Sequence, residues 1–226
     1  MSDQSTAIAL DRSAVMPLLV MAGASGVGLL ALWALGGSAE GAWLRMWRDA
    51  ADPANYWMPH LLLRSVQDLT ALGGIPVMLF FCLLAAGLLV VMHRLALAGF
   101  LFASVLGGIA LNSFLKAMID RGRPDVVPHA VEVLTPSFPS SHAMMSTITY
   151  LTLGLICARN LPGLNVRRYI MTVAMMVPLI IGCTRVVLGV HWPTDILAGW
   201  CLGALWVLFC WAVAARITGG QAASGA

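Results

Sequence analysis

Charged residues are scarce in this chain of 226 residues. Asp, Glu, Lys and Arg make up 10% of it, against roughly a quarter in an average soluble domain. The net charge is only +3, and no run of five like charges occurs. This balance argues against a nucleic-acid-binding surface and against a charged tail. Apolar residues make up 60% of the chain, so we expect most of its surface to face lipid.

Recognisable cysteine motifs are absent as well. The sequence contains no CxxC pair and no Cys/His spacing typical of zinc. All five cysteines fall within apolar stretches: Cys82, Cys157, Cys183, Cys201 and Cys210. We therefore predict small core side chains rather than disulfides or metal ligands.

Long apolar stretches are what the chain does have. A bilayer core of about 30 Å requires about 20 apolar residues in a helix. Six stretches qualify, at about 14–37, 69–92, 95–116, 141–159, 168–185 and 194–215. The first could be a cleaved signal peptide ending at Ala39, but its length and its two preceding aspartates favour a retained span. We expect an all-α, integral membrane bundle of six transmembrane helices, forming a single domain over 1–226.

Six spans would place both termini on one side of the membrane. That side would carry six basic residues and the opposite side seven, so the raw count does not decide the orientation. Setting aside Lys116, Arg123 and Arg185 as site residues leaves four on the opposite side. The positive-inside rule then predicts cytoplasmic termini.

The segment between the first two spans, residues 40–68, has an amphipathic part. Trp43, Leu44 and Trp47 share one helical arc, whereas Arg48 and Asp49 lie on the other. This pattern predicts a helix in the membrane interface that ends at Asp52-Pro53. The alternative is a loop packed on the bundle.

Three polar clusters fall at the predicted outer ends of spans. They are Lys116 to Pro124 after the third span, Phe138 to His142 before the fourth, and Thr184 to Asp195 between the fifth and sixth. Ionisable groups at membrane depth are costly and therefore indicate function. Each cluster alone has a structural explanation, such as a snorkelling side chain. The topology nevertheless brings all three to one face.

The residue types in these clusters favour an anion. Lys116, Arg123 and Arg185 supply three positive charges, and arginine matches phosphate oxygens in a bidentate manner. Ser140 and Ser141 open a helix, whose free N–H groups bind anions. A metal site is the rival interpretation, but three neighbouring cations would repel a divalent ion. We predict phosphate binding and no metal or other cofactor.

Two histidines supply the remaining chemistry. His191 and Asp195 are four residues apart, so the carboxylate can accept from one ring nitrogen and leave the other free as a nucleophile. His142 is then the group that protonates the departing alkoxide.

These residues form the pattern by which the sequence resembles the type 2 phosphatidic acid phosphatase family, which includes vanadium haloperoxidases and glucose-6-phosphatase. The family pattern is Lys, six residues, Arg-Pro; then Pro-Ser-Gly-His; then Ser-Arg, five residues, His, three residues, Asp. The matching residues are Lys116, Arg123, Pro124, Pro139, Ser140, His142, Arg185, His191 and Asp195. Ser141 replaces the usual glycine and Thr184 the usual serine.

The resemblance implies a phosphohistidine at His191, oriented by Asp195, with His142 as the general acid. It also implies phosphate binding by Lys116, Ser140, Arg123 and Arg185, activity without metal, and a site facing away from the cytoplasm. Asp120 and Arg121 are expected to pair locally and to take no part in catalysis.

We therefore expect an inner-membrane phosphatase whose partners are a lipid phosphate and the bilayer, with no nucleic acid and no obligate protein partner. The substrate class would be undecaprenyl diphosphate, phosphatidylglycerophosphate or phosphatidic acid. A lipid phosphotransferase using the same phosphohistidine is the first alternative. An anion or lipid transporter is the second, although no pair of matching broken spans supports it.

Overall fold

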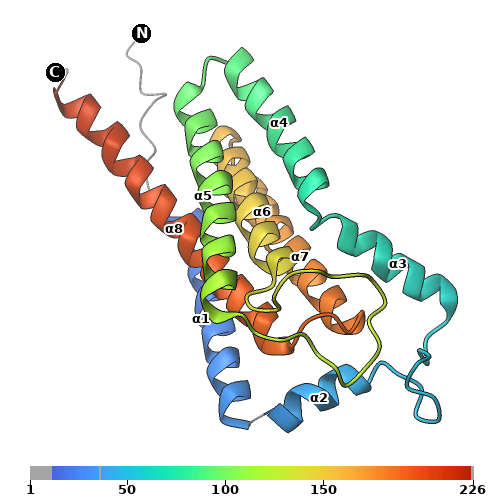
Figure 1. Cartoon of the computed structure of the whole chain (residues 1–226). Coiled ribbons are helices and arrows are strands. Elements are labelled where there is room, and N and C mark those ends of the chain that lie inside the picture. The colour runs from blue at the N-terminus through green and yellow to red at the C-terminus, as the bar shows by residue number, and fades with distance from the viewer. Residues whose placement is uncertain (1–11, 36, 225–226) are drawn as a thin grey trace.

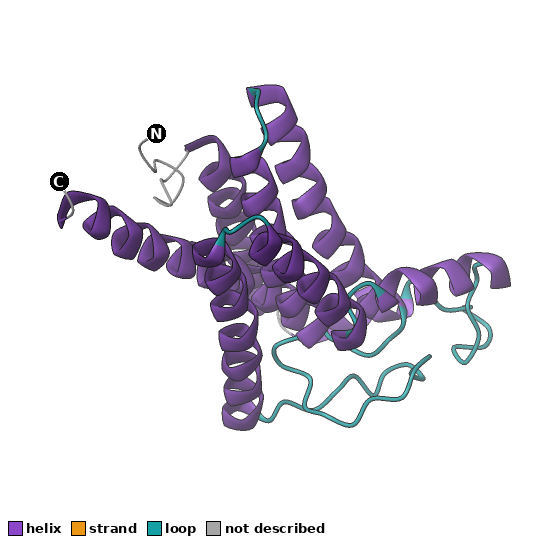
Figure 2. Ribbon diagram, turned by 90° about the horizontal axis from the view of Figure 1, so that it is seen from above, coloured by secondary structure: helices purple, strands orange, loops and turns teal. Residues whose placement is uncertain are grey.

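The computed structural model describes residues 12–35 and 37–224, and this part of the chain is built of helices. They are α1 Arg12–Leu35, α2 Gly37–Arg45, α3 His60–Ala71, α4 Ile75–Val91, α5 Leu95–Ile119, α6 Ser141–Asn160, α7 Leu164–Val187 and α8 Pro193–Ser224. No strand occurs among the described residues, only an isolated bridge between Arg48 and Tyr56. The all-α prediction is confirmed. Figure 2 shows that the longer loops gather on one side of the molecule.

Five of the described helices are long and apolar enough to cross a bilayer: Val15–Leu35, Leu95–Ile119, Ser141–Asn160, Leu164–Val187 and Pro193–Ile217. Helices α3 and α4 would provide a sixth span if they count as one, but they are bent by 48° at their junction. The expected span over 69–92 therefore consists of parts of two helices instead of one. Gly73 and Gly74 have low helix propensity, and Pro76 fits only the first turn of the new helix.

The outer segment also differs from its prediction. Helix α2 ends at Arg45 instead of continuing to Asp52, and α3 is a second helix in the same segment. Arg48, expected on a water-facing arc, is buried: it donates to the Pro128 carbonyl at 2.8 Å and lies 3.8 Å from the centre of the Tyr56 ring. Such a tertiary contact overrides helical periodicity, which reports only on local sequence.

Helix α6 lies at the centre of the bundle and packs against α5, α7 and α8. Two of its buried hydroxyls are bonded within the helix: Ser146 donates to the Ala143 carbonyl at 3.3 Å and Thr147 to the same carbonyl at 2.7 Å. Glycines let its neighbours approach closely. A Cβ atom at Gly203 of α8 would lie 2.9 Å from the Met144 carbonyl oxygen, and one at Gly199 would lie 2.9 Å from the Ala143 Cβ. Small residues at such crossings are the usual basis of helix packing in membranes.

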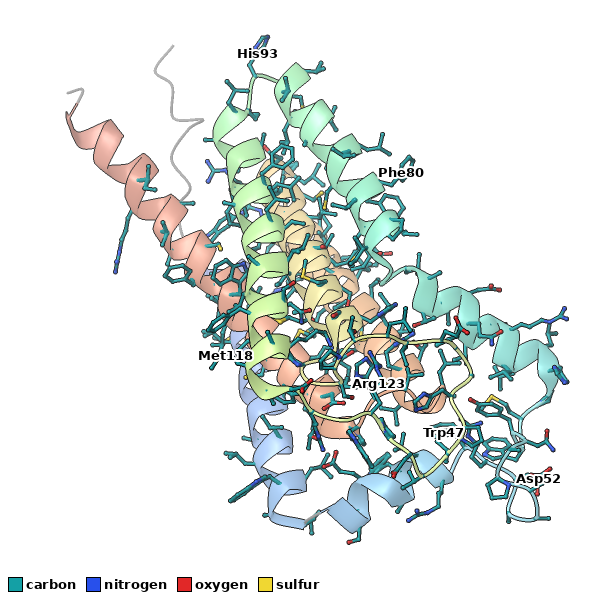
Figure 3. The ribbon with its side chains drawn as sticks, in the orientation of Figure 1. Trp47, Asp52, Phe80, His93, Met118 and Arg123 are labelled. Atoms are coloured by element: carbon teal, nitrogen blue, oxygen red, sulfur yellow. The ribbon has the colours of Figure 1, made fainter. Side chains whose placement is uncertain are left out.

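One end of the bundle carries all three polar clusters. Helices α5 and α7 end there, α6 and α8 begin there, and α2 and the loop between α5 and α6 cover the same end (Figure 1). His93, in the turn between α4 and α5, lies at the opposite end (Figure 3). The predicted convergence of the clusters is therefore seen in the fold.

A glycine substitution tests the α6–α8 packing. Gly203→Ala should lower stability by about 1–3 kcal/mol, because the added methyl group overlaps the α6 backbone. Gly87→Ala in α4 is the matched control, since no atom of residues 12–35 or 37–224 outside its own helical surroundings lies within 4 Å of its added Cβ. Thermal unfolding in detergent should show a lower Tm for Gly203→Ala than for Gly87→Ala, and equal values would contradict this packing.

Candidate active site

The predicted site residues come together at the ends of four helices. Lys116 is in the last turn of α5, Ser140 caps α6, His142 and Ser141 are in the first turn of α6, Arg185 is in the last turn of α7, and Asp195 is in the first turn of α8. His191 lies in the short turn between α7 and α8. Arg123, in the loop after α5, is found beside these helix ends (Figure 3).

His191 and Asp195 form a buried pair. The distance from His191 Nδ1 to Asp195 Oδ2 is 3.3 Å, and the two residues are 2% and 0% exposed. Because an ionised carboxylate only accepts, Nδ1 carries the proton. Nε2 is then a lone-pair nitrogen, and Arg123 Nη1 lies 3.2 Å from it. The free nitrogen thus faces a cation that would also attract a phosphate.

The surroundings of His191 keep its imidazole neutral. The pKa of His191 is lowered to about 4, chiefly by burial; the charges of Arg123 and Arg185 contribute to the lowering, whereas Asp195 acts in the opposite direction. At neutral pH the Nε2 lone pair is therefore available to an electrophile.

Arg123 is held in place from two sides. Its Nη1 donates to the Val190 carbonyl at 2.7 Å, and its Nε donates to the Thr135 carbonyl at 2.9 Å. Burial lowers the pKa of Arg123, but a guanidinium of such high intrinsic basicity stays charged. The loop between α5 and α6 and the turn before α8 thus position this cation jointly.

One N–H group of the buried Arg185 guanidinium is available to a bound anion. The residue is 4% exposed, and its Nη1 donates to the Thr70 hydroxyl at 3.1 Å. Its Nε, however, is buried and has no hydrogen-bond partner among the residues that the structure describes. Buried donors are nearly always paired in native proteins, so this atom is suited to an oxygen of a bound anion. Lys116, the third cation, donates from Nζ to the Pro136 carbonyl.

His142 is half-buried in the first turn of α6, within electrostatic reach of Lys116, Arg123, Arg185 and His191. The break between α3 and α4 packs on its ring. A Cβ atom at Gly73 would lie 3.1 Å from His142 Cδ2. Glycine at this point lets the backbone lie directly beside the imidazole.

The two serines at the start of α6 differ in their contacts. The Ser140 amide donates to the Asp195 carbonyl at 3.1 Å, and its side chain accepts from the Ala143 amide as an N-cap. The Ser141 hydroxyl is directed to α5, where it donates to Asn112 Oδ1 at 2.7 Å. Phosphate binding by Ser141 therefore depends on its backbone N–H.

Sequence reasoning missed several residues of the site. Arg121 was expected to pair locally with Asp120, but its Nη1 donates to Asp195 Oδ1 at 2.7 Å and its Nη2 to Glu40 Oε1 at 3.2 Å. Ser137, fully buried, donates to Asp195 Oδ2. Because these partners are far apart in sequence, no local spacing of residues predicts the contacts. The position of Arg121 inside the first polar cluster was nevertheless a signal that it belongs to the site.

Among the described residues, no group of three or more His, Cys, Asp or Glu side chains is placed so that it could hold a metal ion. Asp195, the carboxylate beside the histidines, is occupied by hydrogen bonds from Arg121, Trp192 and His191. The geometry instead favours an anion between Arg123, Arg185 and the start of α6.

Known proteins are similar to part of this chain in sequence. Phosphatidylglycerophosphatase B of Bacillus subtilis is 38% identical over 96 residues, covering 42% of this chain and 47% of the relative. Decaprenylphosphoryl-5-phosphoribose phosphatase of Mycobacterium tuberculosis is 36% identical over 98 residues, 42% of this chain and 49% of the relative. An undecaprenyl-diphosphatase of Sulfolobus acidocaldarius is 29% identical over 115 residues, 49% of this chain and 48% of the relative. The matches thus span about half the length of these curated relatives.

The fold has a solved counterpart. The crystal structure of a transmembrane PAP2 type phosphatidylglycerolphosphate phosphatase from Bacillus subtilis matches with a TM-score of 0.69 at 24% identity, covering 91% of this chain and 96% of that one. This likeness supports a multi-pass membrane protein. The family model described as PAP2 superfamily matches residues 96–218, more than half of the chain and all three polar clusters. The chain belongs to the PAP2 superfamily.

Proposed function

We propose that this protein is a lipid phosphatase that hydrolyses a lipid phosphate or diphosphate through a phosphohistidine at His191. The observation that carries the proposal is the buried His191–Asp195 pair, whose free Nε2 faces Arg123. The unpartnered Nε of Arg185 adds a second donor for the same anion. The names of the relatives, all phosphatases, support the substrate class.

Phosphate binding would place the phosphorus atom in line with His191. Lys116, Arg123 and Arg185 neutralise the charge on the non-bridging oxygens, and the free N–H groups at the start of α6 donate to them. His191 Nε2 then attacks phosphorus while the bond to the lipid oxygen breaks. Asp195 stabilises the positive imidazole that forms.

His142 acts on the leaving group. It transfers a proton to the departing lipid oxygen, which would otherwise leave as an alkoxide or a phosphate anion. The neutral His142 next removes a proton from a water molecule that attacks the phosphohistidine. Inorganic phosphate leaves, and both histidines return to their starting protonation states.

The same fold supports a proposal for the membrane arrangement. We propose that the chain is a single membrane domain with six passes, in which α3 and α4 form one bent span. With Lys116, Arg123 and Arg185 set aside as site residues, the positive-inside rule supports cytoplasmic termini, and the site would face the periplasm or the outside. The exposed Trp43 of α2 and Leu61 of α3 support placing these helices at headgroup depth.

Phosphate release tests the function directly. Purified protein in detergent micelles should release inorganic phosphate from at least one member of a lipid phosphate and diphosphate panel, also in the presence of EDTA. His191→Ala should lower turnover by about 10³-fold or more, because it removes the nucleophile. His60→Ala, at the exposed start of α3, is the control and should retain activity.

Different failures of that assay have different meanings. Release only after addition of an acceptor lipid would replace hydrolysis with phosphotransfer. Strong inhibition by EDTA would restore a metal mechanism. Release by His191→Ala at the wild-type rate would refute the nucleophile assignment, and no release from any lipid would refute the phosphatase itself.

The role of His142 predicts a dependence on the leaving group. His142→Ala should slow hydrolysis of an alkyl phosphate by about 10²–10⁴-fold, since an alkoxide needs a proton. The first step with p-nitrophenyl phosphate should be much less affected, because nitrophenolate leaves unaided. The measurement is the pre-steady-state burst of nitrophenol, and equal losses with both substrates would exclude a general acid.

A further inference from the structure

Beyond the histidines, a chain of alternating charges extends away from the nucleophile. Asp195 Oδ2 faces His191, and Asp195 Oδ1 accepts from Arg121 Nη1 at 2.7 Å. Arg121 Nη2 in turn donates to Glu40 Oε1 at 3.2 Å. Glu40 belongs to α2, Arg121 to the loop after α5, and Asp195 to α8. Three separate segments thus supply one continuous network.

Glu40 also fixes the beginning of α8. Its Oε2 accepts from the Thr194 hydroxyl at 2.7 Å and lies 3.4 Å from the Thr194 amide nitrogen. Arg121 Nη1 donates to the same hydroxyl at 2.7 Å. A carboxylate at a helix N-terminus satisfies free N–H groups and the helix dipole. The network therefore fixes the position of the turn that carries Asp195 and also balances the charge of that turn.

Burial makes these charges effective. The side chain of Glu40 is 8% exposed, that of Asp195 0%, and that of Arg121 31%. Charges that are partly removed from water act over longer distances than exposed ones. Arg123 of the loop after α5 and Arg185 of α7 also act on His191, and both disfavour a proton on it. His142 of α6 interacts electrostatically with His191, and Lys116 of α5 interacts with His142.

We propose that Arg121 and Glu40 are positioning residues that tune the nucleophile through Asp195. Arg121 holds Asp195 so that Oδ2 faces His191, and its charge offsets part of the attraction of Asp195 for a proton on the imidazole. Glu40 neutralises Arg121 and limits that effect. The proposal rests on the proposed function, since it assigns a role in the reaction at His191.

The sign of each effect follows from electrostatics. Removing the Arg121 charge leaves Asp195 uncompensated, so His191 should hold its proton to higher pH. Removing the Glu40 charge leaves Arg121 uncompensated, so His191 should lose its proton at lower pH. A network that only holds the fold would not produce opposite shifts.

The experiment compares pH profiles of kcat/KM for p-nitrophenyl phosphate. Its acid limb reports deprotonation of the free nucleophile, and the ionisation of the substrate is the same for every variant. The acid limb of Arg121→Gln should lie about one pH unit higher than the acid limb of the wild-type protein. The limb of Glu40→Gln should move down by a smaller amount. Arg121→Lys, which keeps the charge, should leave the limb near its wild-type position while lowering kcat.

Matched variants separate this proposal from others. Arg64→Gln and Asp68→Asn alter exposed charges on α3 and should shift neither limb. The double variant Arg121→Gln with Glu40→Gln should lie between the two single variants. Shifts in the same direction, or activity losses without any shift, would overturn the tuning role. Absence of activity in the wild-type protein would refute the proposed function itself.

Discussion

The carboxylate of Asp195 is fully buried at the start of α8, and the rest of the site is arranged around its charge. Oδ1 accepts from Arg121, and Oδ2 accepts from Ser137, His191 and the Trp192 amide. A buried charge is tolerated only when it is paired and fully hydrogen-bonded. Its donors come from the loop between α5 and α6 and from the turn before α8. Satisfying one carboxylate therefore brings these segments together.

The same packing explains why the site lies at the end of the bundle. Helices α6 and α8 meet closely through Gly199 and Gly203, and the Ser140 amide donates to the Asp195 carbonyl. The beginnings of α6 and α8 are thus fixed relative to each other. The first would supply N–H groups to the proposed phosphate, and the second supplies Asp195, the partner of His191. Chemistry at this depth would meet a lipid phosphate without drawing its chains out of the bilayer.

The helices and the convergence of the polar clusters could be predicted from sequence because they depend on local patterns. Apolar length predicted the five long helices that could cross a bilayer, and the spacings Lys116 to Arg123 and His191 to Asp195 pointed to the clusters. Arg121, Ser137 and Glu40 escaped because their partners are distant in sequence, up to 81 residues for Arg121 and Glu40. Arg48 was misplaced for a similar reason, its carbonyl partner being in another loop.

The most direct test of the account is the identity of the phosphorylated residue. His142→Ala, which lacks the group that activates water, should accumulate the covalent intermediate when mixed with p-nitrophenyl phosphate. After an alkaline quench, which preserves phosphohistidine, mass spectrometry of the peptides should locate the phosphoryl group on His191. A phosphoryl group on any other residue, or turnover of this variant with no labelled enzyme, would contradict the central claim.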